Sequence, residues 1–173
     1  MISDTKVVAI GGGTGLSTML KGLKLHTHNI TAVVTVADDG GSSGILRSDL
    51  GMLAPGDVRN CVSALAEVDP VMGELLNFRF KDGSLKGHSL GNLFLAALNE
   101  TSSSFDEAVK KFSHLTGVVG TVYPVTNESV TLSALLEDGR LIEGESHIGV
   151  HHDGPKNGIV KLMVNPEKPK AVD

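Results

Sequence analysis

The sequence predicts an α/β fold in which a parallel sheet with flanking helices is followed by a β-rich extension. The short apolar run "KVVAI" at residues 6–10 breaks into "GGGTG", after which apolar residues recur at helical spacing. The run "ITAVVTV" at residues 30–36 is apolar nearly throughout, which is typical of an interior strand of a parallel sheet covered on both faces. After residue 118 the chain is strand-like, and Asp138-Gly139 is a hairpin turn signal.

Helix start signals divide the segment between the second strand and residue 117. Asp57 follows the turn Pro55-Gly56 and stands where an N-cap is expected, and Asp69-Pro70 opens another helix. Ser89 and Ser104 are expected to cap two further helices, the second in a capping-box pattern. The chain up to residue 117 therefore has the layering of an α/β protein.

The extension, residues 118–173, is expected to belong to the same domain as the layered part, residues 1–117. Its expected strands lie in "VVGTVYPV", "VTLSALLED", "GRLIEGESHI" and "IVKLMV", and "HHDGPKNG" is expected as a loop. The sequence contains no internal repeat.

Composition excludes several classes of protein. A net charge of -5, with 15 basic residues scattered among 20 acidic ones, argues against a nucleic-acid binder, which needs a basic face. Cys61 is the only cysteine, so no internal disulfide forms, and "MISDTKVVAI" lacks the features of a secretion signal. No apolar run approaches the roughly 20 residues of a membrane helix, so no membrane insertion is expected. The expected location is the cytoplasm.

The glycine loop after the first strand is a candidate anion site. Gly12, Gly13 and Gly15 leave backbone N–H groups unhindered at a helix start, and Thr14 adds a hydroxyl. The loop lacks the third glycine of the dinucleotide fingerprint, which disfavours an NAD-dependent enzyme, and it lacks the lysine of a Walker loop. A turn that merely joins strand to helix is the alternative.

Two consecutive acids, Asp38 and Asp39, end the second strand. In doubly wound folds an acid at this place hydrogen-bonds ribose hydroxyls. The pair has two further possible roles, to hold a divalent metal such as Mg²⁺ or to act as a base toward a hydroxyl. Simple capping of the following loop is the structural alternative.

The glycines and serines that follow these acids are a second candidate cradle. Gly40, Gly41, Ser42 and Ser43 offer backbone donors and hydroxyls for a pyrophosphate, against the alternative of a flexible surface loop. Two fork-shaped cationic donors are nearest in sequence, Arg47 and Arg59.

Further candidate site residues stand near helix starts. Asp57 is either a cap or a ligand group, and Asn60 is unusual on an otherwise apolar helix face. His88 and Asn92 lie around the helix start at Ser89, where a ligand can sit. The histidines show no metal-ligand spacing, so no metal site is predicted.

Five sequence blocks together resemble one family. They are "GGGTGLSTMLKGLK", "ITAVVTVADDGGSSG", "GMLAPGDVRNCVSALA", "GHSLGNL" and "TNESVTLSALLEDG", in order over residues 6 to about 148. The set resembles the gluconeogenesis factor family (YvcK type), which is homologous to CofD, the 2-phospho-L-lactate transferase of deazaflavin coenzyme synthesis. The resemblance implies a Rossmann-like fold and a role in growth and cell shape on gluconeogenic carbon sources.

The resemblance also implies a ligand and the residues that bind it. Family members are similar to nucleotide-sugar binding proteins, with UDP-N-acetylglucosamine as the characteristic ligand. Gly12 to Gly15 and Asp38 to Ser43 are then expected to line the site. Its walls are expected to be completed by family motif positions, namely Asp57, Arg59, Asn60, His88 and Asn92.

The chain departs from the family pattern in two ways. Ile45 stands where the family commonly has a basic residue after "GGSSG", which removes one phosphate contact. Family members are also nearly twice as long and continue with a helix, a strand and a "GPGSL" motif. The resemblance therefore implies that this chain corresponds to the N-terminal half.

Two functions remain in competition. The favoured one is a non-enzymatic regulatory protein that binds a nucleotide sugar, with a homo-oligomer or regulatory protein partners left open. The alternative is a CofD-like phosphotransferase, in which Asp38 or Asp39 organises Mg²⁺ or deprotonates an acceptor hydroxyl.

Overall fold

A computed structural model describes residues 3–149 and 157–172, and its centre is a parallel three-stranded sheet. The strands β1 (Val7–Gly11), β2 (Ile30–Val34) and β3 (Thr121–Pro124) pair in the order β1-β2-β3. The predicted α/β fold is confirmed, including the strand, glycine loop and helix at the start of the chain. The third strand comes from the part expected as the extension, since "VVGTVYPV" supplies β3.

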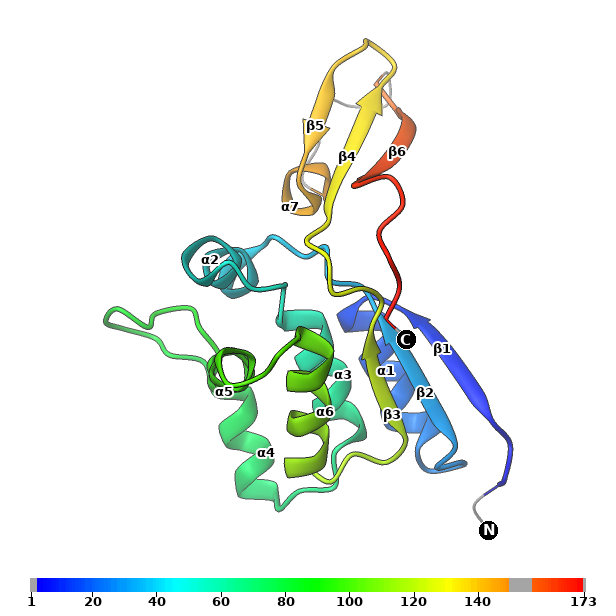
Figure 1. Ribbon diagram of the computed structural model, residues 1–173, viewed down its shortest axis with the longest axis vertical. Coiled ribbons are helices and arrows are strands. Elements are labelled where there is room, and N and C mark those ends of the chain that lie inside the picture. Colours follow the sequence, from blue (N-terminus) through cyan, green and yellow to red (C-terminus); the bar gives the residue numbers. More distant parts are fainter. Residues whose placement is uncertain (1–2, 150–156, 173) are drawn as a thin grey trace.

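Helices cover one face of this sheet (Figure 1). Leu20, Val58 and Phe112 from the helices and Val34 and Val122 from the strands are fully buried between the two layers. The helices up to the third strand are α1 (Gly13–Leu23), α2 (Gly41–Leu50), α3 (Gly56–Leu65), α4 (Pro70–Asn77), α5 (Leu90–Glu100) and α6 (Phe105–Leu115).

The opposite face of the parallel sheet carries no helix within the described residues. Exposure alternates along β1, where Ala9 is buried while Val8 and Ile10 are exposed. The expectation that β2 is covered on both faces is therefore wrong for this chain. An apolar residue of β2, Val33, nevertheless occurs on the second face, as in a strand that is covered on both faces.

The extension forms a separate antiparallel sheet that projects from the helical layer (Figure 1). Its strands β4 (Thr131–Leu136), β5 (Leu141–Glu143) and β6 (Ile159–Asn165) pair in the order β5-β4-β6. The predicted turn at Asp138-Gly139 joins β4 to β5, and Gly139 takes the positive φ of 84° that favours glycine. The strand expected in "GRLIEGESHI" is confirmed for Leu141–Glu143 and is wrong beyond it, because the following residues form the short helix α7 (Glu145–Gly149). Most of "HHDGPKNG" lies outside the described residues.

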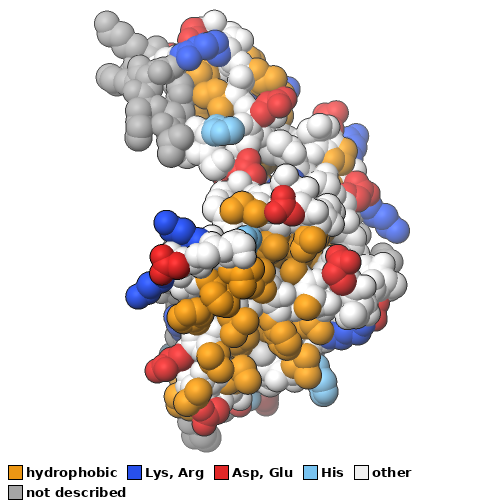
Figure 2. Space-filling model, turned by 90° about the vertical axis from the view of Figure 1, so that its left-hand side faces the viewer, with side chains coloured by type: hydrophobic (Ala, Val, Ile, Leu, Met, Phe, Trp, Pro, Cys, Tyr) orange, Lys and Arg blue, Asp and Glu red, His pale blue; other side chains and the backbone are white. Residues whose placement is uncertain are grey.

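An apolar patch remains exposed on α4 and α5. Figure 2 shows hydrophobic side chains gathered on this side of the molecule. The exposed members include Val71, Met72, Leu75 and Phe78 at α4 and Phe94 in α5.

Within the described part of the chain, no helix combines the length and hydrophobicity needed to cross a bilayer.

The predicted helix caps are confirmed at three of the four positions. Asp69 accepts a hydrogen bond from the Val71 N–H at 2.9 Å, and Ser89 and Ser104 cap α5 and α6. The prediction for Asp57 is wrong, because Pro55 is the N-cap of α3 and no side chain caps that helix. Asp57 is thus free for another role.

Replacing Ser104 with alanine is expected to lower the free energy of unfolding by about 1 kcal/mol, because the first turn of α6 loses its cap. Ser113→Ala in the same helix is the matched control. The Ser113 hydroxyl is buried and has no partner among the described residues, so its removal is expected to be neutral or stabilising. Denaturant titration of both variants checks this, and equal losses would contradict it.

Candidate functional site

A small polar pocket lies beyond the carboxyl end of β2, where the first turns of α2 and α3 meet. Its volume is about 170 Å³. In parallel α/β sheets, ligands bind outside the carboxyl ends of the strands. The lining residues are Asp38, Gly40, Gly41, Ser42, Ser43, Gly56, Asp57, Arg59, Asn60, Arg79 and Asn92.

The start of α2 supplies backbone donors to this pocket. Gly40 is the N-cap of α2, so "GGSSG" begins a helix, and the alternative of a flexible loop is wrong. The N–H groups of Gly41, Ser42 and Ser43 belong to the first turn, where no intrahelical acceptor exists for them. The Ser43 hydroxyl accepts a hydrogen bond from the Gly56 N–H at 3.2 Å and joins α2 to α3. A helix start of this kind favours an anion.

The two consecutive acids have different surroundings. Asp38 lines the pocket, and its Oδ1 accepts a hydrogen bond from the Gly40 N–H at 2.9 Å. Asp39 does not line it, because its Oδ1 accepts from the Ser146 N–H at 2.8 Å and ties the loop after β2 to α7. Burial raises the pKa of Asp39, but hydrogen bonds from Ser146 and the charge of Arg47 outweigh burial and lower it. Asp38 is therefore the acid of the pair that lines the pocket.

Arg47 also lies outside the pocket. Its guanidinium donates to the carbonyl oxygens of Ala37 at 3.1 Å and Val130 at 2.8 Å. These bonds connect the loop after β2 to the start of β4. Arg47 therefore holds the loop after β2 next to the residue that precedes the projecting sheet.

A buried chain of hydrogen bonds forms the floor of the pocket. The Arg59 Nε donates to Asn92 Oδ1 at 3.2 Å, which orients the Asn92 amide so that its Nδ2 donates to Ser42 Oγ at 3.0 Å. Ser42 Oγ in turn lies 3.0 Å from Nδ1 of His88. His88 is buried behind Ser42, so it supports the floor from outside the lining.

Arg59 is a buried cation that has no anionic partner among the described residues. Its exposed fraction is 7%, and its guanidinium bonds the neutral amides of Asn92 and Asn77. Within residues 3–149 and 157–172, no carboxylate forms an ion pair with it. Burial, and next the nearby charge of Arg79, lower the pKa of Arg59. Because buried charges are normally paired, an anionic ligand fits this environment.

Arg79 and Gly56 were not among the sequence candidates, yet both line the pocket. Arg79 lies in the turn-rich segment between α4 and α5, where its guanidinium donates to the Gly87 carbonyl. No motif surrounds it in sequence, so only the fold brings it near Arg59. From the sequence, Gly56 is expected only as part of a turn. A Cβ at this position would lie 3.0 Å from Asp38 Oδ2.

The first glycine loop lies next to the pocket but does not line it. The Asp57 side chain lies beside this loop, and its carboxylate accepts a hydrogen bond from the Gly13 N–H at the start of α1. Gly12, Thr14 and Gly15 are exposed around this point. The role of Gly12 to Gly15 in ligand binding stays a prediction, and for Gly13 the N–H already has an acceptor.

Asp57 contacts the first glycine loop and also lines the pocket. Burial raises its pKa above the ordinary value of 3.8, the Gly13 hydrogen bond opposes this, and the charge of Asp38 raises it further. The pKa of Glu145 is raised as well, first by burial and then by the charges of Asp57, Asp38 and Asp39. These carboxylates therefore lie close enough to one another to make this part of the pocket region acidic.

Replacing Asp57 with asparagine is expected to raise the Tm by a few degrees at neutral pH. The native state binds the Asp57 proton more tightly than the unfolded state does, so stability falls as pH rises through 3.8 and the raised native pKa. Asparagine keeps an acceptor for the Gly13 N–H and removes the buried charge. The gain is expected to vanish at acid pH, where Asp57 is protonated. Thermal unfolding of both proteins across pH checks the prediction, and a pH-independent difference would contradict it.

Comparison with known proteins gives a consistent result. The chain is 57% identical over 171 residues to a putative gluconeogenesis factor of Thermoanaerobacterium thermosulfurigenes, with 99% of this chain and 53% of the relative covered. It is 46% identical over 175 residues to the gluconeogenesis factor of Bacillus subtilis, covering 97% and 53%. The chain thus spans about half the length of these relatives.

Solved structures and a family model agree with this. A crystal structure of a UPF0052-family protein of Bacillus halodurans superposes with a TM-score of 0.88 at 42% identity, covering 98% of this chain and 54% of the other. A second crystal structure of the same Bacillus halodurans protein gives a TM-score of 0.90 at 43% identity with the same coverage. The model of the family described as 2-phospho-L-lactate transferase CofD matches residues 7–173. The chain therefore belongs to the CofD family.

Proposed function

We propose that this chain carries the diphosphate-binding part of a nucleotide-sugar site, with UDP-N-acetylglucosamine as the ligand. The protein acts as a cytoplasmic, non-enzymatic regulator needed for cell shape and for growth on gluconeogenic carbon sources. The observation that carries the ligand class is Arg59, a buried guanidinium that faces the pocket without an ion-pair partner among the described residues.

Two kinds of lining residue suit the two parts of such a ligand. Arg59, Arg79 and the first-turn N–H groups of α2 offer positive charge and donors to a diphosphate. Asp38 and Asp57 offer acceptors to sugar or ribose hydroxyls. A ligand whose diphosphate is joined to hydroxyl-bearing sugars satisfies both kinds of lining residue.

The size of the pocket limits how much of the ligand it encloses. Its volume of about 170 Å³ lies below the roughly 300 Å³ at which small-molecule sites usually begin. It therefore has room for a diphosphate and part of one sugar. The base of the nucleotide then lies against residues outside this pocket.

Isothermal titration tests the proposal with four ligands: UDP-N-acetylglucosamine, GDP, NAD and inorganic pyrophosphate. This chain and the full-length Thermoanaerobacterium relative are titrated in parallel. The expected order of affinity is UDP-N-acetylglucosamine first, with measurable pyrophosphate binding by this chain. Absence of binding of any uridine nucleotide sugar to both proteins would refute the proposal, and a preference for NAD would redirect it to a dinucleotide enzyme.

A transferase is the second candidate, favoured by the family match to 2-phospho-L-lactate transferase CofD. In that case a phospholactyl-type group moves from a nucleotide diphosphate adduct to a hydroxyl acceptor: the acceptor oxygen forms a new P–O bond, the P–O bond within the diphosphate breaks, and the nucleoside monophosphate leaves. Asp38 is the residue placed to accept the acceptor's proton, since Asp39 is bonded to Ser146. Turnover of such an adduct, lost in Asp38→Asn without loss of folding, would establish this function.

A Mg²⁺ ion fits the transferase alternative. No group of three or more potential protein ligands for a metal occurs in the described part of the chain. Mg²⁺ however commonly binds through one or two carboxylates together with substrate phosphates and water. Asp38 and Asp57 are the two carboxylates that would hold it, and the ion would neutralise charge on the diphosphate.

A further inference from the structure

The uncovered face of the parallel sheet is a second surface that the pocket does not explain. We call it the bare face and define it by Val8 and Ile10 of β1, Thr31 and Val33 of β2, and Thr121 and Tyr123 of β3. The strand register places these residues side by side, because Val8 pairs with Thr31 and Ile10 with Val33, and these in turn pair with Thr121 and Tyr123. Val8 is 66% exposed and Ile10 is 76% exposed. A parallel sheet normally has both faces covered.

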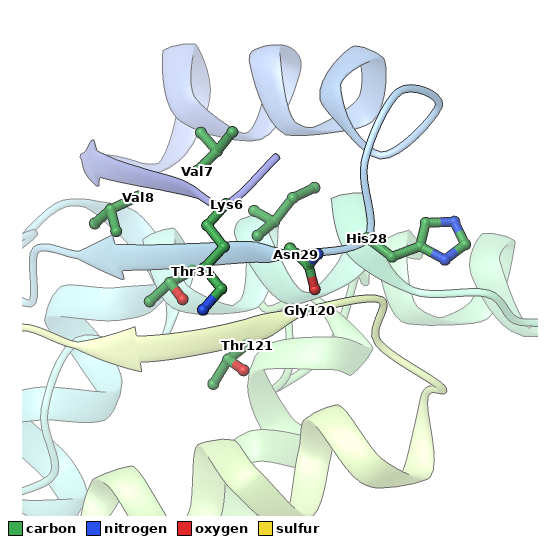
Figure 3. Close-up of a pocket in the computed structure, with 9 residues that line it drawn as sticks. Lys6, Val7, Val8, His28, Asn29, Thr31, Gly120 and Thr121 are labelled. Atoms are coloured by element: carbon green, nitrogen blue, oxygen red, sulfur yellow. The ribbon is translucent and has the colours of Figure 1, made fainter. Parts of the chain in front are cut away.

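The bare face is hollowed at both ends of the strands. Near the strand starts, a groove of about 340 Å³ runs past Val8, Thr31 and Thr121 (Figure 3). Its lining is largely uncharged, and Lys6 is its one lysine among the described residues. Near the strand ends, Val33, Tyr123 and Val125 line a hollow of about 410 Å³. The face therefore offers shape as well as apolar area to an occupant.

The last described residues of the chain lie on this face. Ala171 and Val172 line the hollow at the strand ends, and the Val172 N–H donates to the Val125 carbonyl at 3.3 Å. Ala171 also forms an antiparallel bridge with Thr126. Any residues that follow in a longer chain start from the edge of the bare face.

We propose that the half of the longer protein that lies outside this chain packs against the bare face and covers it. The matched part is 53% of the Thermoanaerobacterium relative, so nearly as many residues again exist there to cover the face. A segment that continues from residue 173 is held at a high local concentration beside the face, which a second, separate copy of the chain is not. The proposal concerns folding and assembly, and it holds whether or not the pocket binds a nucleotide sugar.

Thiol footprinting tests this proposal with a cysteine placed on the bare face. The native Cys61 is fully buried, and burial followed by the charge of Asp57 raises its pKa to about 12, so it gives little background. Ile10→Cys is compared in this chain and in a chain extended past residue 173 by the remaining half of the Thermoanaerobacterium relative. Leu162→Cys is the matched control, because Leu162 is 57% exposed on the projecting sheet.

The expected result is that extension slows the labelling of position 10 by more than about tenfold, while position 162 labels equally in both chains. Co-expression of the remaining half as a separate polypeptide gives the same readout if the continuous chain misfolds. Undiminished labelling of position 10 with the second half present in either form would overturn the proposal. Protection of position 10 in the short chain that disappears on dilution would overturn it in favour of a second copy.

Discussion

Replacing Arg59 with glutamine is expected to weaken binding of UDP-N-acetylglucosamine by about a hundredfold, which corresponds to about 2.7 kcal/mol. A buried guanidinium makes charge-assisted hydrogen bonds to phosphate, and each is worth about 1.5–3 kcal/mol. Arg59 lies within the pocket wall, so its charge is little screened by water. Glutamine keeps a hydrogen-bond donor toward Asn92, but it supplies neither the positive charge nor the paired N–H donors of the guanidinium. Isothermal titration at fixed ionic strength gives the ratio of dissociation constants.

Two further variants separate this effect from a general change of charge or folding. Arg79→Gln is expected to weaken binding less, because Arg79 is exposed at the rim of the same pocket. Lys81→Gln makes the same change of charge two residues away outside the pocket lining, and it is expected to leave the affinity within about twofold. Thermal unfolding shows whether each variant is folded. Unchanged affinity in a folded Arg59→Gln protein would refute the assignment of the diphosphate to Arg59.

The sequence predicts the elements around the site better than the direction of its side chains. Glycine and serine between two apolar runs indicate unhindered backbone donors, and the structure places them at a helix start. Arg47 and Arg59 are equivalent by sequence criteria, but Arg47 bonds backbone carbonyls while Arg59 faces the pocket. The difference arises from the packing of α3 against α5, which no local pattern encodes. Arg79 is missed for the same reason.

The fold shows the same division between local and long-range information. The strand, glycine loop and helix at the start of the chain follow from hydrophobic periodicity and turn residues, which are local. The hairpin at Asp138-Gly139 is local as well. The pairing of β3 with β2 is not local, because these parallel strands lie far apart in the chain. From the sequence, β3 is therefore expected to belong with the strands that follow it.

The apolar character of β2 shows how a correct pattern can have an incomplete explanation. Ala32 and Val34 pack on the helices, while Val33 lies on the bare face. The sequence pattern of a strand buried on both sides is present, but the described residues supply a covering layer on one face alone. This is expected when the second layer comes from residues outside the chain.

Replacing Gly13 with alanine is expected to lower the free energy of unfolding by about 2–3 kcal/mol, although alanine is normally the better helix former. A Cβ at Gly13 would lie 2.8 Å from the Cα of Asp57 and would overlap the Asp57 carboxylate. The carboxylate can rotate away, but then it loses the hydrogen bond from the Gly13 N–H and stays partly buried. The backbone of α3 can move only by opening the contact between α1 and α3.

Gly22→Ala in the same helix is the matched control, because Gly22 is exposed and a Cβ there meets nothing within 4 Å. It is expected to stabilise the protein by about 0.5–1 kcal/mol, through the lower backbone entropy of the unfolded alanine chain. Urea titration of both variants measures the opposite signs. Because Asp57 lines the pocket, Gly13→Ala is also expected to weaken ligand binding, whereas Gly22→Ala is not. Stabilisation by both alanines would mean that α1 and α3 do not meet closely at Gly13.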